Sequence, residues 1–257
     1  MELRLSTTRG TNALLERRGA RTALCITAGF EDLIEIGDQS RPELFARSVR
    51  KRAPFCDVVV GVDERMLADG VRRPLTDAAI EQVIASLRAA AVESVAVALV
   101  HGLAHPEHED RLVGALLAAG WRDVVGAGRL SESPRFLSRV ETAVVHAGVA
   151  PVVRRYLANV AARVAPRMTF MMTSAGGLQR ADRYLARDSL LSGPAGGVAG
   201  VAELGRRIGR TRLLGIDMGG TSTDVARYDN GFHYRFETNV GGARVAAPAL
   251  AIESVAA

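Results

Sequence analysis

Hydrophobic positions along the chain follow two alternating patterns, one typical of strands and one of helices. Short apolar runs rich in valine, isoleucine and threonine indicate strands. We expect strands over the following ranges: Thr22–Thr27, Asp57–Val62, Ser94–Val100, Arg122–Gly126, Arg167–Thr173 and Arg212–Ile216. Between these runs lie segments in which apolar residues recur every three or four positions, the spacing of an amphipathic helix. This alternation of strands and helices predicts an α/β protein.

The intervening segments carry residues that begin and end helices. Asp77–Ala91 places apolar side chains on one face, and Thr76 before it is a suitable N-cap. Three further helices are expected to open at a proline, which suits the first helical turn, and two of them to stop at a glycine. Their expected limits are Pro106 to Gly120, Pro151 onward, and Pro194 to Gly209.

The C-terminal segment has a different pattern. A strand over Arg212–Ile216 is followed by a polar, glycine-containing turn over Asp217–Ser222 and a second strand over Thr223–Tyr228. The pair Asn230-Gly231 then predicts a hairpin turn into a strand over His233–Glu237, because both residues tolerate positive φ. This pattern is typical of the opening of a new domain, so we expect one domain over residues 1–209 and another beginning at residues 210–257.

Composition places the chain among soluble globular proteins of the cytoplasm. Its 257 residues are 48% hydrophobic, enough to bury a core, and no apolar run reaches the roughly 18 residues of a membrane span. The two cysteines, Cys25 and Cys56, lie in apolar stretches and indicate buried thiols in a reducing compartment. We therefore expect a cytoplasmic protein without a membrane partner.

The chain is basic, with a net charge of +5 and a pI near 9.8. The arginines are scattered rather than arranged in a stripe, and aromatic residues make up only 5% of the chain. A surface that binds single-stranded nucleic acid would combine basic residues with aromatic stacking platforms. We therefore interpret the charge as a solvated surface and expect no nucleic-acid partner.

The segment from Leu213 to Asp224 is the strongest candidate for chemistry. An apolar strand ends in an aspartate and is followed by two glycines, three hydroxyl residues and a second aspartate: Asp217, Gly219, Gly220, Thr221, Ser222, Thr223 and Asp224. Glycines let the backbone approach a phosphate closely, and hydroxyls add donors. Asp217 can hold Mg²⁺, which makes it the candidate catalytic and metal-binding residue. No lysine of the P-loop type is present. The alternative is a plain β-hairpin with a Gly-Gly turn.

Two further glycine-rich turns are candidate anion sites. Gly196 and Gly197 lie at the start of the helix near Pro194, where backbone amides can bind an anion. Gly176 and Gly177 follow a strand at its C-terminal end, where α/β sheets bind ligands. The alternatives are close helix packing for the first turn and a tight connection for the second.

One histidine cluster has the composition of a metal site. His101, His105 and His108 stand beside Glu109 and Asp110, but Pro106 prevents one helix from carrying all three histidines. We favour a polar loop whose acidic residues stabilise the N-terminus of the following helix.

The motifs resemble the A subunits of the hydantoinase/oxoprolinase family, and the segment Asp217–Asp224 resembles the phosphate loop of the actin/hexokinase/Hsp70 superfamily. The resemblance runs in order along the whole chain, through the segments at 11–24, 29–37, 174–178, 192–198 and 213–224. It departs from the family at Leu5-Ser6-Thr7-Thr8, where a His-Gly pair is expected, and over Glu141–Ala147. In the family, a first phosphate loop precedes the segment that the range 11–24 resembles, and most of a second half follows the last motif. We expect both of these parts to be missing from this sequence.

The resemblance implies two ribonuclease-H-like halves, as in actin-like ATPases, the first lacking its N-terminal strands and the second only begun. It also implies an ATP-dependent hydrolase of cyclic amides of the hydantoin or 5-oxoproline type, inactive alone, with ATP and Mg²⁺ as cofactors. A B-type subunit or the rest of the chain would be its partner. The alternatives are a non-catalytic binding or assembly module of the same fold and a subunit of a related ATP-dependent ketone carboxylase. Because N-terminal strands are expected to be missing, we expect the sheet that includes Thr22–Thr27 to have an open edge and an exposed apolar face.

Overall fold

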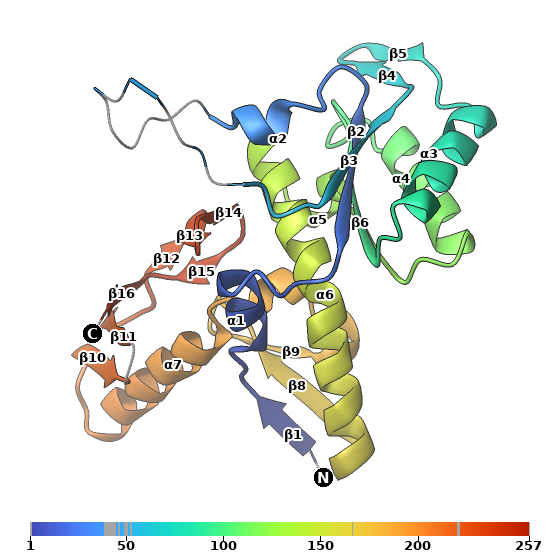
Figure 1. Ribbon diagram of the computed structural model, residues 1–257. Coiled ribbons are helices and arrows are strands. Elements are labelled where there is room, and N and C mark those ends of the chain that lie inside the picture. The colour runs from blue at the N-terminus through green and yellow to red at the C-terminus, as the bar shows by residue number, and fades with distance from the viewer. Residues whose placement is uncertain are drawn as a thin grey trace. The chain divides into compact units, whose positions relative to one another are not determined.

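The computed structural model describes residues 2–38, 45, 47, 48, 51, 53–165, 167–219 and 222–256 (Figure 1). Its contacts define two compact units. Unit 1 comprises Met1–Glu16, Val152–Thr238 and Ala247–Ala257, and unit 2 comprises Arg17–Pro151 and Asn239–Ala246. The expected domain boundary between residues 209 and 210 falls inside unit 1. As a division between the two halves of the family fold, that boundary stays a prediction.

Unit 2 is built on a four-stranded parallel sheet. Its strand order is β3-β2-β6-β7, formed by Val58–Val62, Thr22–Thr27, Ser94–Ala98 and Asp123–Gly126. All four strands are confirmed to within two residues of the predicted ends. Strand β2 lies inside this sheet, because it pairs with β3 on one side and with β6 on the other, and the edge strands among the described residues are β3 and β7. The expected exposed apolar face is not found, because every residue of β2 and β6 is buried.

Both faces of this sheet are covered. Helices α3 (Asp77–Ala89) and α4 (Glu107–Ala118) cover one face, and their apolar side chains join those of alternate strand residues in one core. The core includes Ala23, Cys25, Val95 and Val97 from the strands and Val83, Leu87, Leu112 and Leu116 from the helices. Figure 1 shows the first part of α6 (Phe136–Val164) on the other side of the sheet. Two covered faces explain why every residue of β2 and β6 is buried.

The ends of the helices mostly follow the sequence signals. Thr76 caps α3, since its side-chain oxygen accepts a hydrogen bond from the Ala79 amide at 3.2 Å. Helix α4 begins directly after Pro106, and Gly120 follows it with φ +107°. Helix α7 (Ser192–Arg207) begins two residues before Pro194 and is followed by Gly209 with φ +67°. These three predicted helices are confirmed.

The prediction that a helix opens at Pro151 is wrong, because Pro151 lies inside the 29-residue helix α6. Proline removes one helical hydrogen bond, but the residues before it are almost continuously buried, and this packing outweighs the local loss. By length and composition α6 is long and apolar enough to cross a membrane. However, 67% of its most apolar window is buried inside the structure, as in a core helix.

Unit 1 contains a small mixed sheet with the order β1-β8-β9. The expected strand over Arg167–Thr173 is β8 (Met168–Met172), which pairs in parallel with β1 (Glu2–Leu5) and antiparallel with β9 (Leu178–Arg180). The sequence did not predict β1, because its charged and apolar residues give only four positions of alternation. Helix α1 (Arg9–Leu15) follows β1, and two 3₁₀ turns, Ala181–Arg183 and Ala186–Ser189, precede α7.

A second sheet of unit 1 has the order β10-β11-β16 and is wholly antiparallel. Strands β10 (Arg212–Met218) and β11 (Ser222–Asp229) confirm the predicted strand-turn-strand, and β16 spans Ile252–Ala256. The turn after β11 exists, with Asn230 at φ +51°. The strand after the turn, β12 (Tyr234–Arg235), pairs with β15 (Ala249–Leu250) and not with β11. The predicted hairpin between those two strands is therefore wrong beyond the single bridge of Tyr228 with Phe232.

Helix α7 packs against β10 and β11 through close contacts at two glycines. A Cβ atom on Gly215 would lie 2.8 Å from the Val201 side chain, and one on Gly205 would lie 2.3 Å from Leu213. The helix therefore approaches the strand more closely than larger residues would allow. Buried Ala195, Val198 and Ala226 complete this contact together with Leu250 and Ile252.

Between β12 and β15 the chain forms a short hairpin of β13 (Thr238–Val240) and β14 (Ala243–Val245). Gly241 and Gly242 make its turn with φ of +61° and +84°. Most of this hairpin belongs to unit 2, where the Thr142 hydroxyl accepts a hydrogen bond from the Ala246 amide at 2.8 Å.

Candidate functional site

The two aspartates of the predicted phosphate loop lie directly opposite each other. Strands β10 and β11 pair so that Asp217 lies opposite Asp224. Directly opposed residues of an antiparallel pair project from the same face of the sheet. The register therefore brings together two carboxylates seven positions apart in the sequence.

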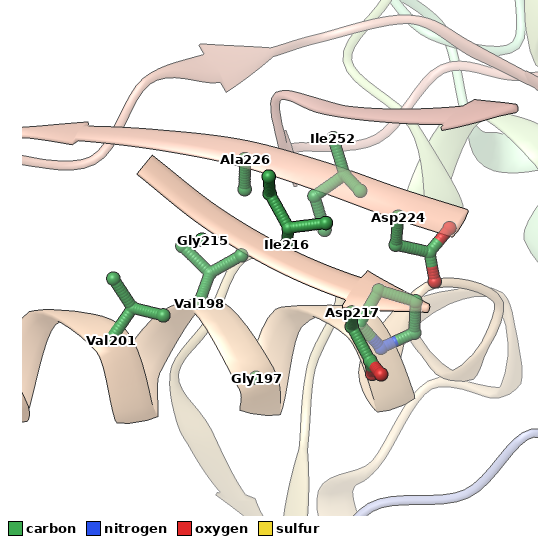
Figure 2. A pocket seen from close by; sticks show the side chains of 10 residues that line it. Gly197, Val198, Val201, Gly215, Ile216, Asp217, Asp224, Ala226 and Ile252 are labelled. Carbon is green, nitrogen blue, oxygen red and sulfur yellow. The ribbon is translucent and has the colours of Figure 1, made fainter. Parts of the chain in front are cut away.

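This face borders a pocket of about 230 Å³ within unit 1. Asp217 and Asp224 line it together with Pro194, Gly197 and Val201 of α7. Figure 2 shows both carboxylates at one end of the pocket and Val201 at the other. The pocket thus has a polar mouth formed by the predicted loop and an apolar interior formed by α7 and the sheet.

The carboxylate pair fits a divalent cation. Like charges placed directly opposite each other in a sheet are destabilising, and a bound cation would remove that repulsion. Mg²⁺ prefers carboxylate oxygens and retains several waters, so two carboxylates at an open mouth suit it better than a closed protein cage. Asp217 is exposed and Asp224 half-buried, which leaves room for water and phosphate oxygens.

The first glycine-rich turn contributes to the same pocket. Gly197 lines the pocket, and nothing lies within 4 Å of a Cβ atom placed on it. Gly196 faces the Ser6 side chain instead, at 3.8 Å from such an atom. The structure therefore brings Gly197, Asp217 and Asp224 together, and Gly196 lies beside them on the first turns of α7.

The second glycine-rich turn connects β8 with β9. The Thr173 amide donates to the Gly177 carbonyl at 2.8 Å, and the Gly176 amide donates to the Thr173 carbonyl at 2.9 Å. Gly176 has φ +82° and packs against Leu250. Neither glycine lines the pocket of Asp217. The hydrogen bonds within the turn and the packing against Leu250 explain the two glycines as parts of a tight connection between β8 and β9. Phosphate binding by Gly176 and Gly177 stays a prediction.

Of the other predicted loop residues, Gly220, Thr221 and the side chain of Ser222 lie outside the described residues. Gly219 is exposed and follows directly after β10. Thr223 pairs with Met218, one position from the aspartates, so it projects from the opposite face of the sheet. A hydrogen bond from the Thr223 side chain to a phosphate in the pocket would therefore need a change in the turn.

The three histidines do not converge on a common point. His101 is exposed, and the His105 ring lies 3.1 Å from the Ala68 carbonyl. His108 is buried: its Nε2 accepts from the Leu75 amide at 3.3 Å, so its Nδ1 carries the proton and donates to Glu64 at 2.7 Å. Among the described residues, no three His, Cys, Asp or Glu side chains are grouped as metal ligands. The three acidic residues in the first turn of α4 match the expected polar helix start.

Sequence reasoning missed that this helix start is a buried polar network. The Thr27 hydroxyl donates to Glu64 at 2.5 Å, and Glu109 accepts from the amides of Leu99 at 3.1 Å and Gly128 at 2.7 Å. Burial raises the pKa of Glu109, while the two amides and the charge of Arg139 act in the opposite direction. The only signal in the sequence was the pair His108-Glu109 before an apolar helix face, which is also typical of an exposed cap.

Comparison with known sequences identifies the family. The sequence model of the hydantoinase/oxoprolinase N-terminal region matches residues 1–120, and that of hydantoinase/oxoprolinase matches residues 139–257. The chain belongs to the hydantoinase/oxoprolinase family. This membership confirms the resemblance drawn from the ordered motifs.

Two relatives are much longer than the chain. The 5-oxoprolinase PfmaA of Pestalotiopsis fici is 36% identical over 289 residues, a match that covers 99% of this chain and 22% of PfmaA. The caprolactamase subunit alpha of Pseudomonas jessenii is 28% identical, with 98% of this chain and 38% of that subunit covered. The chain thus spans between a fifth and two fifths of these relatives.

Two solved structures have a similar fold. The nucleotide-free structure of acetone carboxylase, an enzyme of ATP-dependent acetone carboxylation, superposes with a TM-score of 0.84 at 22% identity. The ATP-dependent caprolactamase of Pseudomonas jessenii superposes with a TM-score of 0.82 at 25% identity. These matches cover 99% and 97% of this chain and 39% and 38% of those chains. They establish a mixed α/β fold with a parallel sheet.

Proposed function

We propose that this chain is part of an ATP-dependent hydrolase of cyclic amides and that the β10–β11 turn binds the phosphates of Mg²⁺-ATP. One observation carries the proposal: Asp217 and Asp224 face one pocket together with Gly197 at the start of α7. The fold in this proposal is that of an actin-like ATPase, in which the turn belongs to the second ribonuclease-H-like half. Relatives named 5-oxoprolinase and ATP-dependent caprolactamase support the substrate class and the use of ATP.

In this proposal Asp217 and Asp224 hold Mg²⁺, directly or through its waters. The glycines of the turn, Gly219 and Gly220, and the first turn of α7 present backbone amides to phosphate oxygens. The hydroxyls of Thr221, Ser222 and Thr223 add donors. When bound, ATP supplies the phosphoryl group that activates the amide oxygen of the substrate for ring opening. The residues of this chain bind and orient the phosphates and neutralise their charge.

In this proposal a partner supplies the second group of phosphate-binding residues. The chain spans 22% of PfmaA, and a related caprolactamase chain is called subunit alpha, which supports a second subunit or further chain segments as partner. Phosphates held from one loop lose the charge-assisted hydrogen bonds of a second one, each contributing about 1.5–3 kcal/mol. We therefore expect the isolated chain to bind Mg²⁺-ATP only weakly; submicromolar affinity by calorimetry would contradict this expectation.

The metal site is tested on the chain itself with Mn²⁺ as a paramagnetic substitute for Mg²⁺. We expect Mn²⁺ to broaden the backbone NMR signals of Asp217, Asp224 and Gly197 first, and ATP to strengthen the effect. Asp217→Asn keeps the shape but removes one charge, so it should weaken Mn²⁺ binding about tenfold or more.

Asp229→Asn is the matched control, because Asp229 lies at the far end of β11, the strand that carries Asp224, and pairs with Arg227. This variant should bind Mn²⁺ like the unchanged chain. If broadening centres elsewhere, or if Asp217→Asn leaves it unchanged, the proposed assignment of the metal site fails.

A further inference from the structure

The pocket that α7, β10 and β11 line has an interior that the proposed function does not use. Mg²⁺ gives up its waters reluctantly, so the ion and its phosphates suit the polar mouth at Asp217 and Asp224. Figure 2 shows Val201 at the end of the pocket opposite to both carboxylates. Other apolar residues of the lining are Val198, Ala226 and Ile252. The pocket therefore has one end suited to a charge and one end suited to hydrocarbon.

The apolar walls are in place without a ligand. The side chains of Val198, Ala226 and Ile252 are no more than 9% exposed and pack in one cluster. A Cβ atom on Gly215 would lie 2.8 Å from the Val201 side chain, so helix and strand are in close contact at the apolar end. Preformed walls reduce the ordering cost of binding a small ligand.

The charge of the pocket selects the sign of its ligand. Among the described residues that line it, Asp217 and Asp224 are the only charged ones. The two lie directly opposite each other in the strand register, so their negative charges repel. A cationic group beside both carboxylates would reduce this repulsion, whereas an anionic group would add to it.

The volume of the pocket sets the size of the hydrocarbon part. A closed apolar cavity of about 150 Å³ is large enough to bind benzene. This pocket measures about 230 Å³. It therefore has room for a six-membered carbon ring together with a small polar group.

We propose that the pocket binds a small aliphatic ammonium ion. Its ammonium group lies at the mouth, beside Asp217 and Asp224, and its hydrocarbon part lies against Val198 and Val201. An ammonium group has three N–H donors, and its hydrogen bonds to a carboxylate are charge-assisted. The hydrocarbon part adds the burial of apolar surface, which an inorganic cation at the mouth does not provide.

Binding of the ammonium ion does not depend on the proposed function, because it needs neither metal nor nucleotide. Its effect on the phosphate site does rest on that function. The ammonium group and Mg²⁺ would occupy the same mouth, so the ammonium ion would inhibit the binding of Mg²⁺-ATP. Ammonium binding is measured without metal, and Mn²⁺ binding is measured without amine. A failure of one experiment therefore leaves the other interpretable.

The test adds cyclohexylammonium chloride to the 257-residue chain and follows the backbone NMR shifts of residues around the pocket. A ligand of this size is expected to bind with a dissociation constant of roughly millimolar order. Cyclohexanol, which has the same ring without the charge, should bind at least about tenfold more weakly. Methylammonium, which lacks the ring, should also bind at least about tenfold more weakly. Cyclohexanecarboxylate, with the opposite charge, should not bind measurably.

Two glycines of α7 provide a matched pair of variants. Gly197 lines the pocket and Gly200 does not, and nothing lies within 4 Å of a Cβ atom placed on either of them. Gly197→Leu should fill part of the pocket and weaken cyclohexylammonium binding about tenfold. Gly200→Leu makes the same change on the same helix outside the pocket and should have no effect.

The position of the ammonium group is tested with Asp217→Asn, which should weaken cyclohexylammonium binding about tenfold because it removes a charged acceptor. In a chain that binds Mn²⁺, cyclohexylammonium should also raise the dissociation constant of Mn²⁺. Equal binding of cyclohexanol, simultaneous binding of Mn²⁺ and cyclohexylammonium, or binding unchanged by both Gly197→Leu and Asp217→Asn would overturn the proposal.

Discussion

The parallel sheet of unit 2 and the antiparallel sheet of unit 1 differ in how their faces are covered. Every residue of β2 and β6 is buried, whereas β10 buries none of its seven residues fully. Leu214, Ile216 and Met218 of β10 are 64%, 63% and 76% exposed, although they are apolar. One sheet therefore has cover on both faces, and the other has α7 on one face and an apolar surface on the other.

This difference shows that similar apolar strand patterns can contribute differently to stability. Apolar burial contributes about 25 cal/mol per Å² removed from water, so an apolar residue on an exposed face contributes little. The hydrophobicity of β10 is nevertheless informative. Exposed apolar patches mark surfaces of interaction, and the chain spans only 22% to 39% of its relatives.

The largest expected effect comes from placing a charge in each sheet at a leucine. Leu24→Asp in β2 buries an unpaired carboxylate at a position with no exposed surface, so it should destabilise the chain by more than about 4 kcal/mol. Leu214→Asp in β10 should change the free energy of unfolding by less than about 0.5 kcal/mol. Urea denaturation followed by circular dichroism measures both. Equal losses would show that the outer face of β10 is buried in solution, and light scattering would show whether self-association covers it.

A smaller effect is expected from the buried carboxylate of α4. Glu109→Ala leaves the amides of Leu99 and Gly128 without an acceptor inside the structure, at a cost of about 3 kcal/mol. Glu107→Ala, on the exposed side of the same helix turn, should change the stability by less than about 0.5 kcal/mol. The same denaturation experiment compares the two variants. A loss below 1 kcal/mol for Glu109→Ala would mean that water replaces its carboxylate.

Two helical glycines should respond in opposite directions to alanine. Gly205 of α7 has no space for a Cβ atom, which would meet Leu213 and the Arg210 carbonyl, so Gly205→Ala should cost about 1–3 kcal/mol. Gly114 of α4 has nothing within 4 Å of such an atom, and Gly114→Ala should stabilise by about 0.5–1 kcal/mol. Thermal unfolding midpoints give both signs. A stabilising Gly205→Ala would show that α7 lies further from β10 in solution.

The smallest expected effect is a pH dependence. Burial raises the pKa of Glu109 above its ordinary value of 4.5, so the unfolded chain ionises this group first as the pH rises. Stability due to this group should be fully present below pH 4.5 and should be lost as the pH rises through the pKa of the folded state. Glu109→Gln lacks this loss. The difference in the free energy of unfolding between the two proteins, measured from pH 4 to pH 7, should therefore shift in favour of the variant; the opposite slope would contradict a raised pKa.

The sequence predicted elements that are governed by local pattern and missed those governed by distant contacts. Strands β2, β3, β6 and β7 are short apolar runs, and α3 carries its own cap, so their positions could be predicted. Strand β1 depends on pairing with β8 far along the chain, and α6 runs through Pro151 because the residues before it are almost continuously buried. No local signal encodes either contact.

The candidate site was predictable to a similar extent. The motif predicted Asp217 and Asp224 as partners, but only the register placed them opposite each other and beside Gly197. The network of Glu64, His108 and Thr27 has the same origin in tertiary structure.

The interruption of unit 1 by unit 2 has a consequence for how the chain folds during synthesis. Strand β1 must wait for β8, which the ribosome makes only after all of Arg17–Pro151. That segment contains all four strands of the parallel sheet of unit 2, and only the segment Asn239–Ala246 of this unit comes from later in the chain. Closing the long loop between β1 and β8 costs entropy that grows with its length, and a folded unit 2 would shorten its flexible part. We therefore expect unit 2 to fold first on the ribosome, with β1 as an unpaired N-terminal segment that joins its sheet late.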